Sequence, residues 1–181
     1  MQVLKRVLAV LGVLLGVLLL WGLSEPYHLD VEEHEAPQPN LRAGWEGKQI
    51  AFVSDWQFGM WMANGATVRR SVREVVERRP ALLLIGGDFV YHAEGKREEV
   101  LEKVTRALRP LRDANIPAFA VLGNHDYGLN KRDDPPNEEL AREVAETLEA
   151  AGVRVLENEA VPLRADGDTL YVVGIGARWA G

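Results

Sequence analysis

The sequence of 181 residues contains no cysteine and only four histidines. The absence of cysteine excludes disulfide bonds and zinc sites built from thiolates. Any metal ion would therefore be held by carboxylate or amide oxygens and by imidazole nitrogens, which favours Mn, Fe, Mg or a histidine-containing Zn site. The lack of cysteine does not fix the cellular compartment, because proteins of oxidising compartments can also do without it.

A concentrated patch of positive charge is also absent. The formal net charge is −6, and the lysines and arginines are scattered along stretches with helical patterning. Because nucleic-acid-binding surfaces gather basic residues on one face, we expect no nucleic-acid partner. No Gly-x-Gly-x-x-Gly pattern follows the first predicted strand, which argues against nucleotide binding of the doubly wound dehydrogenase type.

A long uncharged run lies near the N-terminus, where residues 7–23 follow Lys5 and Arg6. As a helix rising about 1.5 Å per residue, this run would be about 25 Å long, near the lower limit for crossing a bilayer. We expect residues 1–23 to form an uncleaved signal-anchor, because the run is long for a signal peptide and no small-x-small cleavage site follows. A cleaved signal peptide is the alternative. The basic pair predicts a cytoplasmic N-terminus and places the rest of the protein on the extracytoplasmic side.

Acidic residues and prolines dominate residues 24–47. This composition predicts an extended linker between the membrane segment and a folded domain at residues 48–181. His28 and His34 lie in this stretch, and we interpret both as solvated because no rigid element would hold them.

Apolar runs of strand length alternate with amphipathic helices in the folded domain. Strands are predicted at 49–53, 81–85 and 116–122, followed by short strands at 153–156, 160–163 and 170–173 with a hairpin turn at 166–168. The helix before the third strand is expected to end near Pro110, and the next helix at Gly152. This order predicts an α/β fold with a largely parallel sheet covered on both faces, and a later, more antiparallel part.

Polar residues follow each of the first three predicted strands: Asp55 and Gln57, then Asp88, then Asn124, His125 and Asp126. In open α/β sheets, ligands bind at the carboxyl ends of the strands, so we expect these side chains to meet. A carboxylate beside a core strand is costly unless it is paired, hydrogen-bonded or bound to a metal. The alternative is that the neighbouring Gly and Asn residues only form turns.

The stretches Ser54-Asp55-Trp56-Gln57, Gly87-Asp88-Phe89-Val90 and Gly123-Asn124-His125-Asp126 resemble the first three sequence blocks of the calcineurin-like metallophosphoesterases. The blocks have the same order, and the resemblance covers about residues 49–176. It implies a four-layer α/β/β/α sandwich that hydrolyses phosphate monoesters or diesters with two divalent metal ions, drawn from Mn, Fe, Zn and Mg. Two such ions about 3.5–4 Å apart polarise the phosphorus centre and activate water.

The resemblance also implies a role for each residue. Asp55 and Gln57 would bind one metal ion, Asp88 would bridge both, and Asn124 would bind the other. His125 would protonate or stabilise the leaving oxygen, and Asp126 would orient its ring.

Two departures from the family pattern stand out. The family has a histidine where this sequence has Gln57. Gln57 either binds the metal through its neutral amide oxygen, which favours Mn or Mg over Zn, or hydrogen-bonds nearby without touching the metal. The family continues with a further histidine and a Gly-His-x-His block, whereas this sequence has no histidine after His125. After that residue, only Arg164 and Arg178 would offer a cationic side chain to the site. We therefore expect a domain truncated at its C-terminus. The alternative is a non-catalytic remnant or interaction domain.

Several other residues leave two interpretations open. His92 either faces the substrate or is a solvated loop histidine. Trp56, Phe58, Met60 and Trp61 either belong to the core or wall a pocket for an apolar leaving group. A lipid-linked phosphate ester would suit an active site held near the membrane by a short linker.

Overall fold

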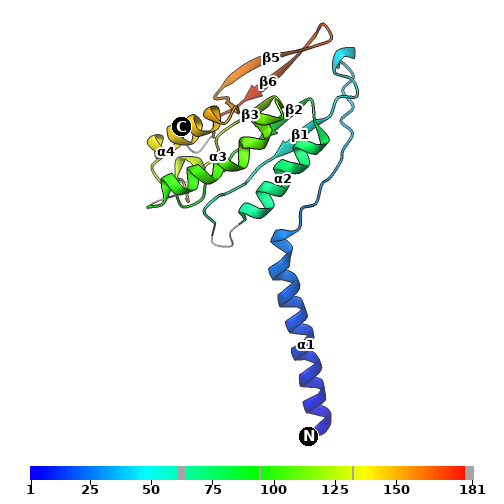
Figure 1. Cartoon of the computed structure of the whole chain (residues 1–181). Helices are drawn as coiled ribbons and strands as arrows, with labels where there is room; N and C mark the ends of the chain where they lie inside the picture. The colour runs from blue at the N-terminus through cyan, green and yellow to red at the C-terminus, as the bar shows by residue number, and fades with distance from the viewer. Residues whose placement is uncertain (61–63, 94, 132, 178–181) are drawn as a thin grey trace. The chain divides into compact units, whose positions relative to one another are not determined.

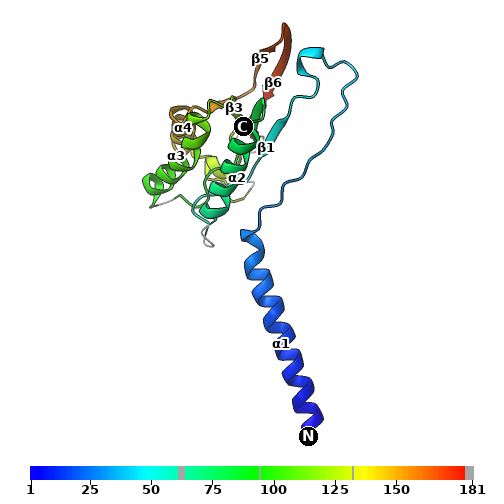
Figure 2. The same ribbon diagram turned by 45° about the vertical axis from the view of Figure 1, so that its right-hand side comes forward.

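The computed structural model describes residues 1–60, 64–93, 95–131 and 133–177. The chain divides into two compact units, one comprising residues 1–33 and the other beginning at residue 34. Figure 1 shows the whole chain, and Figure 2 shows it from a second direction.

The first unit is dominated by helix α1 (Gln2–Ser24), which is followed by the short 3₁₀ helix η1 (Glu25–Tyr27). At about 1.5 Å per residue, the 23 residues of α1 span about 35 Å. None of them is buried, and the helix is long and apolar enough to cross a membrane, a property that signal sequences share. A helix over the predicted segment is therefore confirmed.

The second unit contains a parallel sheet in the order β1-β2-β3-β4. Its strands are β1 (Ile50–Val53), β2 (Leu82–Ile85), β3 (Ala118–Ala120) and β4 (Arg154–Val155). The strands are connected by α2 (Gly65–Arg78), α3 (Arg97–Asp113) and α4 (Glu138–Ala150). The predicted alternation of strands and helices is confirmed, and β4 joins this parallel sheet rather than the later antiparallel part.

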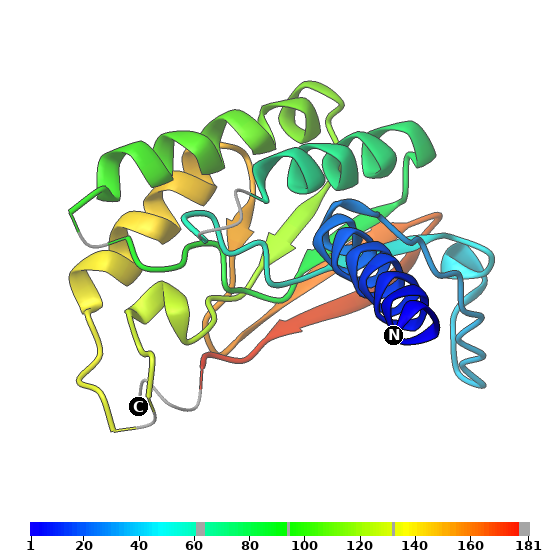
Figure 3. The ribbon, with the colours of Figure 1, turned by 90° about the horizontal axis from the view of Figure 1, so that it is seen from below.

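The three helices lie on one face of the sheet, where they enclose the main core (Figure 3). Val72 of α2, Val104 of α3 and Val144 of α4 are buried here against Leu83 and Ile85 of β2. Each valine belongs to a set of buried residues that recur at helical spacing on the inward side of its helix, as the periodicity predicted. This packing fixes the strand ends from which the polar residues project.

The opposite face of the sheet is covered by an antiparallel hairpin, β5 (Glu159–Ala165) and β6 (Asp168–Gly174). A smaller core between hairpin and sheet contains Leu82, Phe119, Leu156, Val161 and Val172. The hairpin does not cover the β1 side of this face, where Phe52 is 68% exposed. The structure thus has the mixed α/β architecture that was expected, with β-structure over the second face.

Helix α3 continues through Pro110 to Asp113, so the predicted end near Pro110 is wrong. Proline removes one backbone hydrogen bond, but here it lies in the last turns of a 17-residue helix. Burial of Leu108 and Leu111 on either side of the proline stabilises the helical conformation beyond it.

The last part of the predicted linker packs against the folded unit. The 3₁₀ helix η2 (Ala43–Trp45) has Gly44 and Trp45 buried, and the Gly44 N–H donates to Asp168 Oδ2 at 2.9 Å. A Cβ atom on Gly44 would lie 2.2 Å from the Ala165 carbonyl oxygen, so only glycine allows this approach. Residues 28–38 contain no helix or strand, as a linker would.

Candidate functional site

The loops after β1, β2 and β3 meet beyond the carboxyl ends of the strands. The Asp55 N–H donates to the Gly87 carbonyl at 3.1 Å, and the Gln57 N–H to the Asp88 carbonyl at 2.8 Å. The third loop joins them through the His125 N–H, which donates to Asp88 Oδ1 at 3.0 Å. The three predicted groups of polar residues are therefore brought together.

The loops that carry the predicted ligands hold strained backbone conformations. Asp55, Gln57 and Asp88 have positive φ angles of 57°, 42° and 57°. Left-handed conformations of non-glycine residues cost of order 1–3 kcal/mol and cluster at functional sites. No pattern in the sequence indicated this strain.

A cavity of about 360 Å³ lies at this edge of the sheet and is lined by Asp55, Asp88 and Asn124, among others. Three of the four predicted metal ligands thus share one cavity. Gln57 is not among the lining residues, so its role as a ligand stays a prediction. Arg164 lies elsewhere, on β5 opposite Thr169, whereas Arg178 is outside the described residues.

Glycine allows the close contact between the second and third loops. A Cβ atom on Gly123 would lie 2.1 Å from Asp88 Oδ1, and one on Gly87 would lie 2.5 Å from the Gly123 nitrogen. Both distances are far below van der Waals contact, so any larger residue would displace the Asp88 carboxylate or its loop. Gly87 and Gly123 are therefore required for steric reasons beside the predicted ligand Asp88.

The side-chain oxygen atoms of Asp55, Asp88 and Asn124 fit a divalent cation that prefers oxygen ligands. Asn124 Nδ2 donates to the Leu129 carbonyl at 2.9 Å, which orients the amide and leaves its oxygen for another partner. Two carboxylates and an amide oxygen suit a hard cation such as Mg or Mn. Within the described ranges, no group of three or more His, Cys, Asp and Glu side chains is placed to hold a metal ion.

Asp126 fastens the second loop to the third. Its side chain is fully buried, and Oδ2 accepts the Asp88 and Gly123 N–H groups, both at 2.9 Å. Oδ1 accepts the Phe89 N–H at 2.8 Å and the Val90 N–H at 3.2 Å. Burial raises the pKa of Asp126 to about 7, against the opposing effect of these N–H donors.

These partners differ from the one that the family resemblance implied for Asp126. Both carboxylate oxygens bind backbone N–H groups, and in the part of the chain described here no hydrogen bond joins Asp126 to the His125 ring. Sequence reasoning selected the residue but not its partners.

The His125 ring contacts Tyr91, a residue that sequence reasoning missed. The Tyr91 and His125 ring centroids are 4.8 Å apart, and those of Tyr91 and His92 are 4.2 Å apart, both in edge-to-face arrangements. Tyr91 therefore lies between two imidazoles. Its only signal in the sequence was its position, three residues after Asp88 and next to His92.

The aromatic cluster after β1 belongs largely to the core. Trp56 and Phe58 are buried, and the Trp56 ring packs edge-on against Phe89 with centroids 5.8 Å apart. Met60 is partly buried, and Trp61 lies outside the described residues. The apolar-pocket interpretation has no support from Trp56 or Phe58.

Comparisons with known proteins bear on the whole domain. Phosphodiesterase YaeI of Escherichia coli (strain K12) is 29% identical over 133 residues, covering 74% of this chain and 45% of YaeI. The chain thus spans less than half the length of this curated relative. Among solved structures, phosphopantetheinyl hydrolase (PptH) from Mycobacterium tuberculosis matches with a TM-score of 0.44 and 17% identity, covering 69% of this chain and 41% of PptH.

The family comparison covers the same region as the three loops that carry the predicted site residues. The model described as calcineurin-like phosphoesterase matches residues 48–176, which include every predicted site residue. With the shared order of the three sequence blocks and their convergence at one edge of the sheet, this match shows that the chain belongs to the calcineurin-like phosphoesterase family.

Proposed function

We propose that this protein is a metal-dependent hydrolase of phosphate esters. The observation that carries the proposal is the convergence of Asp55, Asp88 and Asn124 on one cavity, with His125 on the adjoining loop. The similarity to a phosphodiesterase favours phosphodiesters within this class, and monoesters remain the second option.

The proposed metal ligands are Asp55, Asp88 and Asn124, with Gln57 as a further candidate. Two divalent ions at this site would supply Lewis acidity toward a phosphoryl oxygen and a nucleophile available at neutral pH. The oxygen-rich donor set favours Mn or Mg.

The chain's own residues then have distinct roles. His125 delivers a proton to the leaving oxygen, and its position is held by the Asp88 Oδ1 contact to its backbone N–H and by the Tyr91 ring. Asp126 keeps the Asp88 loop in its left-handed conformation by accepting hydrogen bonds from the three consecutive backbone N–H groups of residues 88–90.

We further propose that α1 is a signal-anchor and that the second unit lies on the extracytoplasmic side. The length and apolar composition of the helix and the basic pair at Lys5 and Arg6 support this topology. A site tethered in this way would suit lipid-linked phosphate esters.

An alternative is a non-catalytic interaction domain with the same fold. It is favoured by the finding that the described residues hold no cluster of three or more His, Cys, Asp and Glu side chains. Metal analysis separates the two proposals, because two bound ions per chain support the hydrolase and none supports the interaction domain.

The decisive experiment uses the full chain in detergent micelles with Mn and bis(p-nitrophenyl) phosphate. We expect Asp88→Asn and His125→Ala to lower kcat/KM by about 100-fold or more, because each removes a group with a direct role. His34→Ala is the matched control and should retain the full rate, since His34 lies outside the family match. Unchanged turnover in both site variants would refute the assignment.

A further inference from the structure

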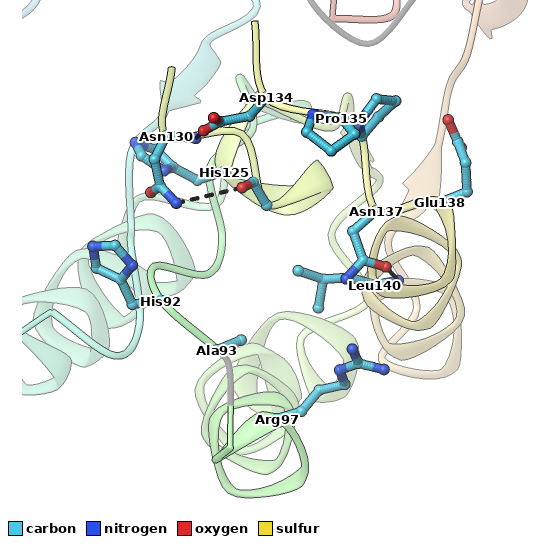
Figure 4. Close-up of a pocket in the computed structure, with 12 residues that line it drawn as sticks. His92, Ala93, Arg97, His125, Asn130, Asp134, Pro135, Asn137, Glu138 and Leu140 are labelled. Atoms are coloured by element: carbon cyan, nitrogen blue, oxygen red, sulfur yellow. Dashed lines mark hydrogen bonds between the residues drawn. The ribbon is translucent and has the colours of Figure 1, made fainter. Parts of the chain in front are cut away.

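A second, larger cavity of about 630 Å³ adjoins His125. Figure 4 shows His92 and His125 on one side of it, and Asn137 and Leu140 on the other. The volume lies within the range of about 300–1,000 Å³ that is usual for small-molecule sites. Because His125 borders this cavity while Asn124 borders the metal-ligand cavity, a substrate whose phosphate lies at the ligands would extend its leaving group here.

The charges around the cavity argue against an anionic leaving group. Arg97 lines it, but its Nη1 lies 3.1 Å from Glu143 Oε1 and 3.6 Å from Glu139 Oε2. Asp134 and Glu138 are also among the residues that line the cavity. The guanidinium charge is thus offset by acidic side chains, and an additional anion would meet repulsion.

The lining also argues against a nucleobase or an acyl chain. Among the described residues that line the cavity, the only aromatic rings are the imidazoles of His92 and His125. Both already contact Tyr91 edge-to-face, so a nucleobase would find no large free ring on which to stack. Most lining side chains carry hydrogen-bonding groups, which an acyl chain would leave without partners. A neutral alcohol with several hydroxyl groups matches both the polarity and the charge balance.

His92 is held in place on the wall of this cavity. Its φ angle of 47° is unusual for a non-glycine residue, and its ring lies edge-to-face with Tyr91, which also contacts His125. A strained backbone conformation persists only where surrounding contacts hold it, and such residues cluster at functional sites.

The loop opposite α3 is also ordered by its own contacts. Asp134 Oδ2 accepts the backbone N–H groups of Asn130 and Lys131 at 3.0 and 2.7 Å. This arrangement presents the Asn130 side chain at the cavity, where Figure 4 shows its bond to the Gly128 carbonyl.

From these observations we infer that the second cavity is a leaving-group subsite for phosphate esters of neutral, hydroxyl-rich alcohols such as polyols or sugars. His92 is a specificity-determining residue of this subsite and hydrogen-bonds a hydroxyl of the alcohol. The inference rests on the proposed phosphoesterase function.

The kinetic experiment compares two diesters on the Mn-loaded full chain: glycerophosphoglycerol, with a polyol leaving group, and bis(p-nitrophenyl) phosphate, with an aryl one. His92→Asn should lower kcat/KM for the polyol diester at least about tenfold and for the aryl diester less than about twofold. Asparagine tolerates the left-handed backbone, so the loop conformation is preserved. His34→Asn is the matched control. An equal loss on both substrates, or no loss on either, would overturn the inference.

A binding readout separates failure of the subsite from failure of the hydrolase assignment. The chain has only four histidines, so its imidazole NMR signals can be followed individually. Titration with millimolar glycerol 3-phosphate should shift the His92 and His125 signals and leave those of His28 and His34 in place. Absence of aryl diester turnover would count against the proposed function, whereas an unmoved His92 signal would overturn the subsite.

Discussion

Asp126 shows how much of this site depends on a single buried side chain. Four backbone N–H groups from two loops point at its two oxygens, and Asp88 in turn accepts from the backbone of the Asp126 loop at His125. Each loop therefore supplies an acceptor for the other. Such reciprocal bonding holds Asp88 in position without any contribution from a ligand.

Asp126→Ala should therefore destabilise the protein strongly. The change leaves four N–H groups without their acceptor, and each unsatisfied buried group costs about 1–3 kcal/mol. We expect the free energy of unfolding to fall by about 3 kcal/mol or more, as measured by urea denaturation of the full chain in micelles. Asp113→Ala is the matched control, because Asp113 is exposed on α3 and should change stability by less than about 0.5 kcal/mol. Similar losses of stability in the two variants would contradict the role of Asp126 in joining the two loops.

The raised pKa of Asp126 also predicts a pH dependence in metal-free protein. The folded-state pKa of about 7 lies above the ordinary value of 3.8, so between these values the folded state binds more protons than the unfolded state. Stability should therefore fall as pH rises from about 4 to about 7 and then level off.

Denaturation midpoints across this pH range, with a chelator present, test this expectation. Asp126→Asn cannot titrate and should flatten the part of the slope that Asp126 contributes. An unchanged slope in the variant would show that other groups govern the dependence.

The positions of the candidate ligands were predictable, but their geometry was not. Asp55, Asp88 and Asn124 follow apolar strands, and parallel strands bring their carboxyl ends to one edge, so the sequence pattern sufficed. The partners of Asp126 and the contact of Tyr91 with His125 depend on how separate loops lie against each other. Local sequence patterns carry little information on such contacts.

At the level of elements, helix α3 shows why boundaries are harder to predict than the elements themselves. Proline normally interrupts a helix, and its effect on α3 was overestimated because burial of Leu108 and Leu111 outweighs one missing hydrogen bond. The small 3₁₀ helix η2 was likewise hidden in an acidic, proline-rich stretch. Its burial depends on Asp168, more than 120 residues away.

Pro110→Ala should increase stability. The side chain of Pro110 is exposed, so the change removes no core contact and restores an N–H donor within the helix. The helix propensity gain of up to about 3 kcal/mol is reduced by the greater freedom of the unfolded chain, which leaves an expected gain of about 1–2 kcal/mol.

Urea denaturation of Pro110→Ala measures this gain. Pro117→Ala is the control, because Pro117 is exposed outside any helix and its replacement should give no increase. A decrease in the stability of Pro110→Ala would mean that the proline fits the helix end better than alanine does.

At the scale of the whole molecule, the absence of cysteine makes the proposed topology directly testable. Single variants Gln2→Cys and Gln38→Cys place one thiol at the first residue of α1 or beyond its C-terminal end, in a chain with no other thiol. With a membrane-impermeant maleimide on intact cells, Gln38→Cys should be labelled, and Gln2→Cys only after permeabilisation.

The opposite labelling pattern would refute the proposed orientation. Loss of the Gln2→Cys thiol from the mature protein would indicate a cleaved signal peptide. The unaltered chain serves as the control for non-specific labelling.

Hairpin β5–β6 carries apolar side chains on both of its faces. Val172 packs inward, whereas Tyr171, Val173 and Ile175 are exposed, and Phe52 is exposed on the neighbouring sheet. In the described part of the chain, β6 pairs only with β5, so one edge of the strand is open. An open edge beside exposed apolar side chains is a template for intermolecular β-pairing. Hairpin β5–β6 therefore adds a second route of colloidal self-association to that of the exposed apolar helix α1, and light scattering of the chain in detergent micelles should rise with protein concentration.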